Sequence, residues 1–92
     1  MKHIAIFTLK DGISEKEFCD FYRNTLGKIP VVKKLTFFRE VGTWSRFSYG
    51  MEILMDSADD WDEYTKHPNH DKAANAWKSF VTDWEEANLV EM

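Results

Sequence analysis

Two of the three histidines and a tyrosine fall within one short segment, Tyr64-Thr65-Lys66-His67-Pro68-Asn69-His70. Imidazole and phenol are side chains that can move protons near neutral pH, so acid–base chemistry is to be sought here first. The segment stands at the entrance to an apolar helix that is predicted to begin around Asn69. Its position makes His70 and Tyr64 the first candidates for a proton-transfer site.

Helical periodicity indicates where His70 points. At 100° per residue, six residues fall within about 40° of one line. They are His70, Ala73, Ala74, Trp77, Val81 and Trp84. His70 is therefore expected to face the apolar side, where desolvation would keep its imidazole neutral and basic near pH 7. The alternative is a structural role, in which His67 caps or ends a helix, His70 makes a hydrogen bond in the core and Tyr64 is simply packed.

A metal site is the other chemistry that two histidines suggest. His67 and His70 are three residues apart, but Pro68 breaks the helical spacing and no further cluster of Cys or His accompanies them. We therefore predict no metal ligand and no cofactor. A nearby group of acids is explained better as the solvated first turn of a helix, where the helix dipole favours carboxylates. The group consists of Asp59, Asp60, Asp62 and Glu63.

Composition restricts the kind of protein and its partners. The chain has 92 residues, which fits one domain over residues 1–92 and leaves no room for a second. A net charge of −4 without a Lys/Arg stripe argues against nucleic acid and anionic membrane surfaces as partners. The aromatic share of 15% indicates a dense core or a lined pocket.

The cysteine content bears on location. A single cysteine, Cys19, cannot form an intramolecular disulfide, and the apolar run in Met1–Lys10 is too short for a signal peptide or a membrane span. We therefore predict a cytoplasmic protein. No pattern of bases near Cys19 marks it as a nucleophile, so we expect it to act as a small hydrophobic side chain in a helix.

The first third of the chain predicts a strand followed by a helix. Residues His3–Leu9 alternate, yet both sides of the alternation are largely apolar, so this strand needs a cover on each face. Ser14 and Glu17 form a capping box that starts a helix, and the helix ends near Gly27. One side of it carries an apolar stripe. The stripe comprises Phe18, Phe21, Tyr22 and Thr25.

Three further strands and a broken helical region follow. The strands are predicted at Leu35–Val41, Phe47–Met55 and, from a short and weak pattern, Ala87–Met92. The hairpin connection Gly42–Arg46 makes the first two of them antiparallel neighbours. Ser57 and Asp60 start a second helix, which Pro68 interrupts before a third begins.

The element order β-α-β-β-α-β is that of the split βαβ, or ferredoxin-like, fold. It predicts an α+β protein with a four-stranded antiparallel sheet and helices on one face. Strands that are apolar on both sides cannot leave the other face in water. We therefore expect a homodimer in which two sheets pack face to face as a dimeric α/β barrel, with Trp44 of the hairpin meeting the partner.

Three segments of the chain carry a family resemblance. They are the opening strand Lys2-His3-Ile4, the turn Gly27-Lys28-Ile29-Pro30, and the His67-Pro68-Asn69-His70 element after an acidic, aromatic helix. Together they resemble the stress-responsive dimeric α/β-barrel (Dabb) family over nearly the whole chain. The resemblance implies two ferredoxin-like subunits that pair their sheets into a barrel. It implies much less about activity, because many members of the family have no assigned reaction.

One characterised branch of the family consists of plant polyketide cyclases, which close a linear tetraketide by aldol condensation and keep its carboxylate. In that branch the second histidine of the His-Pro-x-His element is the base, a tyrosine six residues earlier assists it, and a histidine of the first strand lines the site. The resemblance therefore implies His70 as the base, Tyr64 as a hydrogen-bond donor and His3 as a polar wall of the site.

The pocket wall departs from that of the cyclases. They have a further pocket histidine where this chain has Tyr49, and the surroundings of Ala5 and Thr25 are altered. We expect a small, mostly apolar carbonyl compound to bind between the sheet and the helices. The predicted substrate-binding residues are Ala5, Phe7, Phe21, Tyr22, Tyr49, Met51 and Trp77.

Functions of different classes fit these residues. One is cofactor-free acid–base chemistry, an aldol-type cyclisation or a related proton abstraction by a cyclase or lyase with His70 as the base. Another is a non-catalytic, stress-linked dimerisation or ligand-carrying domain, whose pocket only binds or is filled by its own aromatic side chains. A third, cofactor-independent oxygenation, rests on analogy with other ferredoxin-like dimers.

Overall fold

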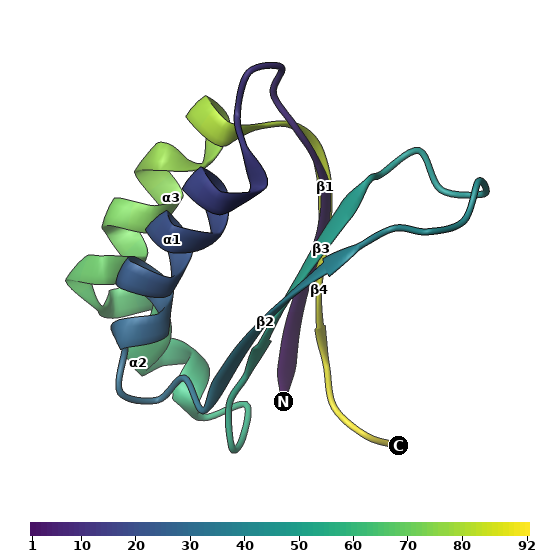
Figure 1. The fold of residues 1–92 in the computed structure, drawn as a ribbon. Helices are drawn as coiled ribbons and strands as arrows, with labels where there is room; N and C mark the ends of the chain where they lie inside the picture. The colour runs from purple at the N-terminus through teal and green to yellow at the C-terminus, as the bar shows by residue number, and fades with distance from the viewer.

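The computed structural model describes residues 1–92 and has two layers, an antiparallel sheet and helices that cover one of its faces (Figure 1). The strands are β1 (Lys2–Leu9), β2 (Lys34–Arg39), β3 (Tyr49–Leu54) and β4 (Val81–Leu89). The helices are α1 (Glu15–Thr25), α2 (Asp60–Lys66) and α3 (Pro68–Phe80), and a short 3₁₀ turn, η1 (Leu26–Lys28), follows α1. The order across the sheet is β2-β3-β1-β4, which confirms the predicted ferredoxin-like α+β fold.

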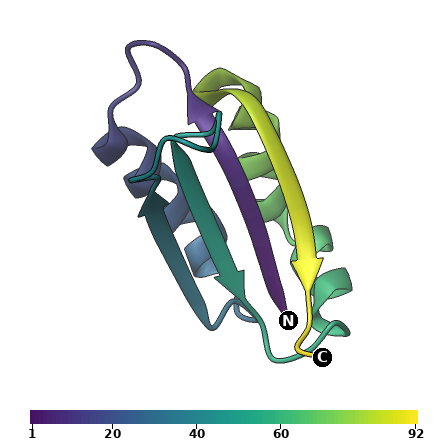
Figure 2. The same cartoon turned by 90° about the vertical axis from the view of Figure 1, so that its right-hand side faces the viewer.

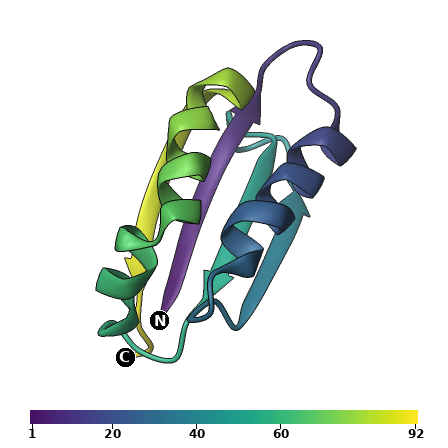
Figure 3. The same cartoon turned by 90° about the vertical axis from the view of Figure 1, so that its left-hand side faces the viewer.

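Alternation along the two central strands decides which side chains face the helices. His3, Ala5 and Phe7 of β1 are buried, as are Met51 and Ile53 of β3. The antiparallel register pairs His3 with Ile53 and Ala5 with Met51, so these side chains form one continuous layer. Seen from the helical side, α1 lies towards the β2 edge of the sheet and α3 towards the β4 edge (Figure 3).

The predicted capping box starts α1. The Ser14 hydroxyl accepts a hydrogen bond from the Glu17 amide at 3.0 Å, which satisfies one of the free amides of the first turn. Farther along the helix, the Tyr22 hydroxyl donates to the Ala73 carbonyl oxygen at 3.0 Å in the core. This bond joins α1 to α3 and holds the two helices in register above the sheet.

One residue separates α2 from α3. His67 leaves helical geometry, with φ −70° and ψ 139°, and its Nδ1 accepts a hydrogen bond from the Asn69 amide at 3.0 Å. Pro68 occupies the first turn of α3, where a missing N–H costs nothing. The interruption predicted at Pro68 is therefore confirmed, and His67 has the capping role of the structural alternative. The start of α2 is shifted, because the helix begins at Asp60 rather than at Ser57.

The end of the chain differs most from the prediction. Periodicity places Trp84 on the stripe of the third helix and a strand at Ala87–Met92, but α3 ends at Phe80 and β4 already begins at Val81. The β1–β4 ladder pairs Leu9 with Val81 and Thr8 with Asp83, so Thr82 is an extra residue that forms a β-bulge. A bulge turns Val81 and Trp84 to the same face, and their spacing of three then imitates a helix.

The other strand ends agree within two residues. β2 ends at Arg39 and β3 begins at Tyr49, so the connection between them is longer than the predicted Gly42–Arg46. The two strands are antiparallel neighbours, as the hairpin pattern predicts.

The face of the sheet opposite the helices is uncovered (Figure 2). Ile6, Phe38 and Leu89 lie on it with 39%, 50% and 49% of their surface exposed. The β2–β3 connection projects on the same side of the molecule (Figure 1) and carries Val41 and Trp44, which are almost fully exposed. We call this surface the open face. Its apolar character is that of a surface which pairs with another protein.

Candidate functional site

The fold brings the three candidate residues together from three different elements. His3 lies on β1, Tyr64 at the end of α2 and His70 in the first turns of α3. The ring centre of Tyr64 is 4.9 Å from that of His70 and 6.3 Å from that of His3. The break between α2 and α3 is what allows this, because it turns the start of α3 back towards the Tyr64 ring.

These rings line a cavity of about 560 Å³ between the sheet, α2 and α3. Its size lies within the range of small-molecule sites. Its lining is mainly aromatic and apolar, with a few polar groups. The lining residues are His3, Tyr22, Leu26, Met51, Trp61, Tyr64, Thr65, His70, Ala73, Ala74, Asn75, Trp77, Lys78, Trp84 and Glu86. We call it the histidine cavity.

Two side chains of β4 hold His3. Its Nδ1 lies 2.6 Å from Asn88 Oδ1, and its Nε2 lies 3.3 Å from Glu86 Oε1. The Trp61 ring packs against the imidazole with a centre-to-centre distance of 5.0 Å. The hydrogen bond from His3 lowers the pKa of Glu86, against the opposing effect of burial. Glu86 therefore stays ionised and places a negative charge beside the two histidines.

One ring nitrogen of His70 is enclosed by the protein. Nδ1 is buried and makes no hydrogen bond. The other ring nitrogen, Nε2, is therefore the one that can meet a ligand. Burial disfavours the imidazolium and lowers the pKa of His70, and the neighbouring His3 adds to this effect, while Asp71 and Glu86 oppose it. A histidine in this environment is neutral near pH 7, which a general base requires.

We expect the titration of His70 to be visible as a pH-dependent stability. The ordinary histidine pKa is 6.5, and burial lowers the folded value below it. Between the two values the unfolded chain binds more protons than the folded one, so the free energy of unfolding rises with pH in that window and levels off above about 6.5. Proton NMR titration of His70 in the folded protein and in urea measures both values. A folded pKa at or above the urea value would contradict this burial.

Tyr64 is buried, with 2% of its surface exposed. Burial raises the pKa of its phenol, and the negative charge of Glu86 acts in the same direction. The hydroxyl therefore keeps its proton at neutral pH. A protonated phenol at the edge of a cavity can donate a hydrogen bond to an oxygen of a bound molecule.

The predicted substrate-binding residues lie in three different places in the structure. Tyr22, Met51 and Trp77 line the histidine cavity with the three candidate catalytic residues. Phe7 and Tyr49 line a second cavity between α1 and the sheet. Ala5 is buried in the sheet layer, and Phe21 packs between Tyr22 and Phe80. These last two residues line neither cavity.

Two polar residues of the site, Glu86 and Asn88, are absent from the prediction. Both lie on β4, which the helical stripe concealed, and both face His3 because strand alternation directs Trp84, Glu86 and Asn88 to the same side. The pattern Trp-x-Glu-x-Asn is the signal that a strand interpretation would have used.

The fold and the histidine cavity define a small ferredoxin-like α+β protein with imidazole and phenol groups between its sheet and helices. The chain belongs to the Stress responsive A/B Barrel Domain (Dabb) family, whose model matches residues 1–90. This confirms the resemblance inferred from the sequence. A comparison with curated proteins gives no match.

Several solved structures share the fold. A Dabb family protein with a ferredoxin-like fold from Mesorhizobium loti has a TM-score of 0.84 at 21% identity, covering 99% of this chain and 95% of its own. Hydroxynitrile lyase from Passiflora edulis has a TM-score of 0.82 at 18% identity, with coverages of 99% and 92%. A dimeric ferredoxin-like protein of unknown function from Thermobifida fusca has a TM-score of 0.74 at 20% identity, with coverages of 94% and 85%. At these identities the likeness establishes the fold alone.

Two further features of the fold concern its helices and its potential metal-binding side chains. None of the three helices has the length and apolar character needed to cross a membrane. No group of three or more His, Cys, Asp or Glu side chains is arranged to hold a metal ion.

Proposed function

We propose that the histidine cavity binds a small, mostly apolar carbonyl compound and that His70 removes a proton next to the carbonyl group. The observation that carries this proposal is the convergence of His3, Tyr64 and His70 on one cavity from three separate elements. Three proton-bearing side chains that meet at an otherwise aromatic wall are typical of a site that orients a polar group of an apolar molecule.

Each residue has a distinct part in this proposal. His70 accepts the proton at Nε2, because its Nδ1 is the buried nitrogen. The Tyr64 hydroxyl donates a hydrogen bond to the oxygen on which negative charge develops as the enolate forms. His3, fixed between Glu86 and Asn88, forms a polar wall that orients the ligand. The reaction class is a cofactor-free lyase or cyclase, such as an aldol-type ring closure, and the similar fold of a Passiflora edulis hydroxynitrile lyase supports it.

We expect the protein to accelerate the exchange of α-hydrogens of a simple ketone with solvent. The probe is phenylacetone in D2O near neutral pD, followed by NMR as its CH2 signal disappears. His70→Ala is expected to lower the protein-dependent exchange rate about 100-fold or more, because the variant has lost the general base. Tyr64→Phe keeps the ring packing but lacks the hydroxyl donor, so its exchange rate is expected to be about 10-fold or more lower than that of the wild type.

His67→Asn is the matched control for that experiment. It removes a histidine from the same segment, yet asparagine can still cap α3, so the fold and the exchange rate are expected to stay unchanged. Full exchange activity in the folded His70→Ala variant would remove His70 from the mechanism. Binding of ketones without any exchange would instead support the non-catalytic, ligand-carrying alternative.

We also propose that two copies pair through the open face. Ile6, Phe38 and Leu89 supply its apolar surface, and the exposed Trp44 extends on the same side. A second copy of the chain offers the same apolar surface and so covers it by a two-fold arrangement. The similar fold of a dimeric Thermobifida fusca protein supports this pairing. Single-domain organisation and a cytoplasmic location stay predictions from the sequence.

A further inference from the structure

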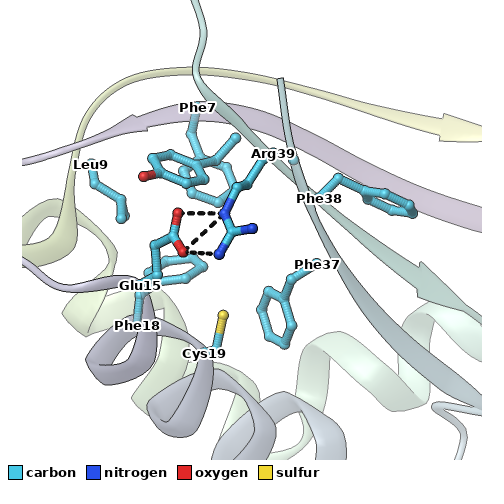
Figure 4. Close-up of a pocket in the computed structure, with 10 residues that line it drawn as sticks. Phe7, Leu9, Glu15, Phe18, Cys19, Phe37, Phe38 and Arg39 are labelled. Atoms are coloured by element: carbon cyan, nitrogen blue, oxygen red, sulfur yellow. Dashed lines mark hydrogen bonds and ion pairs between the residues drawn. The ribbon is translucent and has the colours of Figure 1, made fainter. Parts of the chain in front are cut away.

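A second cavity, of about 400 Å³, lies between α1 and the sheet (Figure 4). It is located where β1 and β2 end and β3 begins. It shares no lining residue with the histidine cavity. The lining residues that matter here are Phe7, Phe18, Cys19, Phe37, Arg39 and Tyr49. We call it the arginine cavity, after the guanidinium group at its mouth. Its volume is close to the lower end of the range for small-molecule sites, which suits a ligand of one or two rings.

The walls of the arginine cavity are aromatic rings held at fixed angles by one another. The Phe18 ring centre lies 5.9 Å from that of Phe37 in an edge-to-face arrangement, and the Phe7 ring stacks at 6.0 Å from Tyr49. Phe7 and Phe18 are buried in the core, so this part of the wall is rigid. Ring faces and edges set in this way favour a flat aromatic molecule over a flexible aliphatic one.

The mouth of the cavity carries one ion pair. Arg39 on β2 donates from Nε and Nη2 to the Glu15 carboxylate on α1, with an Nε–Oε2 distance of 2.8 Å (Figure 4). The two N–H groups on Nη1 take no part in this pair and can donate to a ligand. Because Glu15 already balances the charge of Arg39, the mouth offers hydrogen-bond donors without a net positive charge. It therefore suits a neutral oxygen acceptor better than an anion.

One layer of rings separates the two cavities. Trp77 lines the histidine cavity, and its ring centre lies 5.3 Å from that of Phe7 and 6.1 Å from that of Phe18 in the arginine cavity. Phe7 and Trp77 meet edge to face, so no open passage follows from this contact. A ligand in one cavity can thus be distinguished from a ligand in the other by which residues it touches.

We propose that the arginine cavity is a second binding site, which takes an uncharged one- or two-ring aromatic molecule with a carbonyl or phenol oxygen. The rings of the ligand lie between Phe18, Phe37 and Tyr49, and its oxygen accepts a hydrogen bond from Nη1 of Arg39. This site is independent of the acid–base function proposed for the histidine cavity.

The only cysteine of the chain reports on this cavity. Cys19 lines it and is half-buried, so a molecule bound there shields the thiol. The test measures the rate of Cys19 alkylation by iodoacetamide with increasing 2-acetylnaphthalene. At a probe concentration of ten times Kd, only about one-eleventh of the sites are free, so the rate is expected to fall about tenfold. An unchanged rate at the solubility limit of the probe would overturn the proposal.

Two variants and a second probe locate the ligand. His70→Ala changes only the histidine cavity, so Cys19 protection is expected to persist in this variant. Lost protection would place the probe in the other cavity and overturn the proposal.

In the wild type, 2-ethylnaphthalene, which lacks the oxygen, is expected to protect at least threefold more weakly than 2-acetylnaphthalene. Arg39→Met, which removes every side-chain donor at this position, is expected to abolish this difference. Equal protection by both probes in the wild type would remove Arg39 from ligand recognition.

Discussion

Phe7→Ala is expected to lower the free energy of unfolding by about 4 kcal/mol, because it leaves a cavity where a fully buried ring now packs. Phe7 is 1% exposed at the centre of β1. Its ring contacts those of Phe18 and Trp77, with centre distances of 4.8 and 5.3 Å. Urea unfolding followed by tryptophan fluorescence measures the loss. A small domain has a stability of the same order, so we expect the variant to be partly unfolded at room temperature.

Phe7→Leu is the matched control at the same position. Leucine keeps most of the apolar volume and the strand position, so its loss is expected to be no more than about half that of alanine. Equal and small losses for both variants would show that the ring is not enclosed, and would contradict the assignment of Phe7 to the helix-facing side of β1.

Ile6→Glu is expected to weaken the proposed homodimer at least about 100-fold, as measured by sedimentation equilibrium over a range of protein concentrations. Ile6 lies next to Phe7 on β1 but points to the open face, where 39% of its surface is exposed in the single chain. Two-fold symmetry puts the new carboxylate into the interface twice, and each copy loses water without gaining a partner. About 1.4 kcal/mol for each copy already amounts to the hundredfold change.

Ile6→Val tests whether that effect comes from charge or merely from substitution. Valine preserves the apolar contact, so the dissociation constant is expected to rise by less than tenfold. The Ile6→Glu chain should remain folded as a monomer, with unchanged circular dichroism. If it instead dimerises as tightly as the wild type, the partner surface lies elsewhere on the molecule.

Local sequence patterns predicted the elements of this fold well wherever one physical signal dominates. The Ser14 capping box, the alternation of His3–Leu9 and the interruption at Pro68 each depend on residues close in the chain, and each is confirmed. The element order then leaves few topologies, because antiparallel neighbours and right-handed crossovers exclude most alternatives. The family match over residues 1–90 agrees with this inference.

The end of the chain was harder to predict because two signals coincide there. Trp77, Val81 and Trp84 have helical spacing, but the spacing from Val81 to Trp84 arises from the bulge at Thr82. A bulge is a property of a strand pair, and its partner, β1, lies more than seventy residues earlier. No local pattern at Val81–Leu89 carries that information. The same error hid Glu86 and its contact with His3.

The site was predicted in part for a similar reason. His70 and Tyr64 are close in the sequence, so their proximity could be inferred from the helical segment itself. That His3 joins them was implied only by the family resemblance. The division of the aromatic residues into two cavities depends on how Phe7, Phe18 and Trp77 pack against one another, which is decided by tertiary packing and not by chain spacing.

The contact between His3 and Asn88 links residues 85 positions apart, across the pairing of the first strand with the last. The polar wall around His3 therefore cannot form until β4 has paired with β1. Loop closure over such a span is also among the slower steps of folding. His3 is therefore held by Glu86 and Asn88 only in molecules in which the first and last strands are paired, so any change that loosens β4 also releases this imidazole.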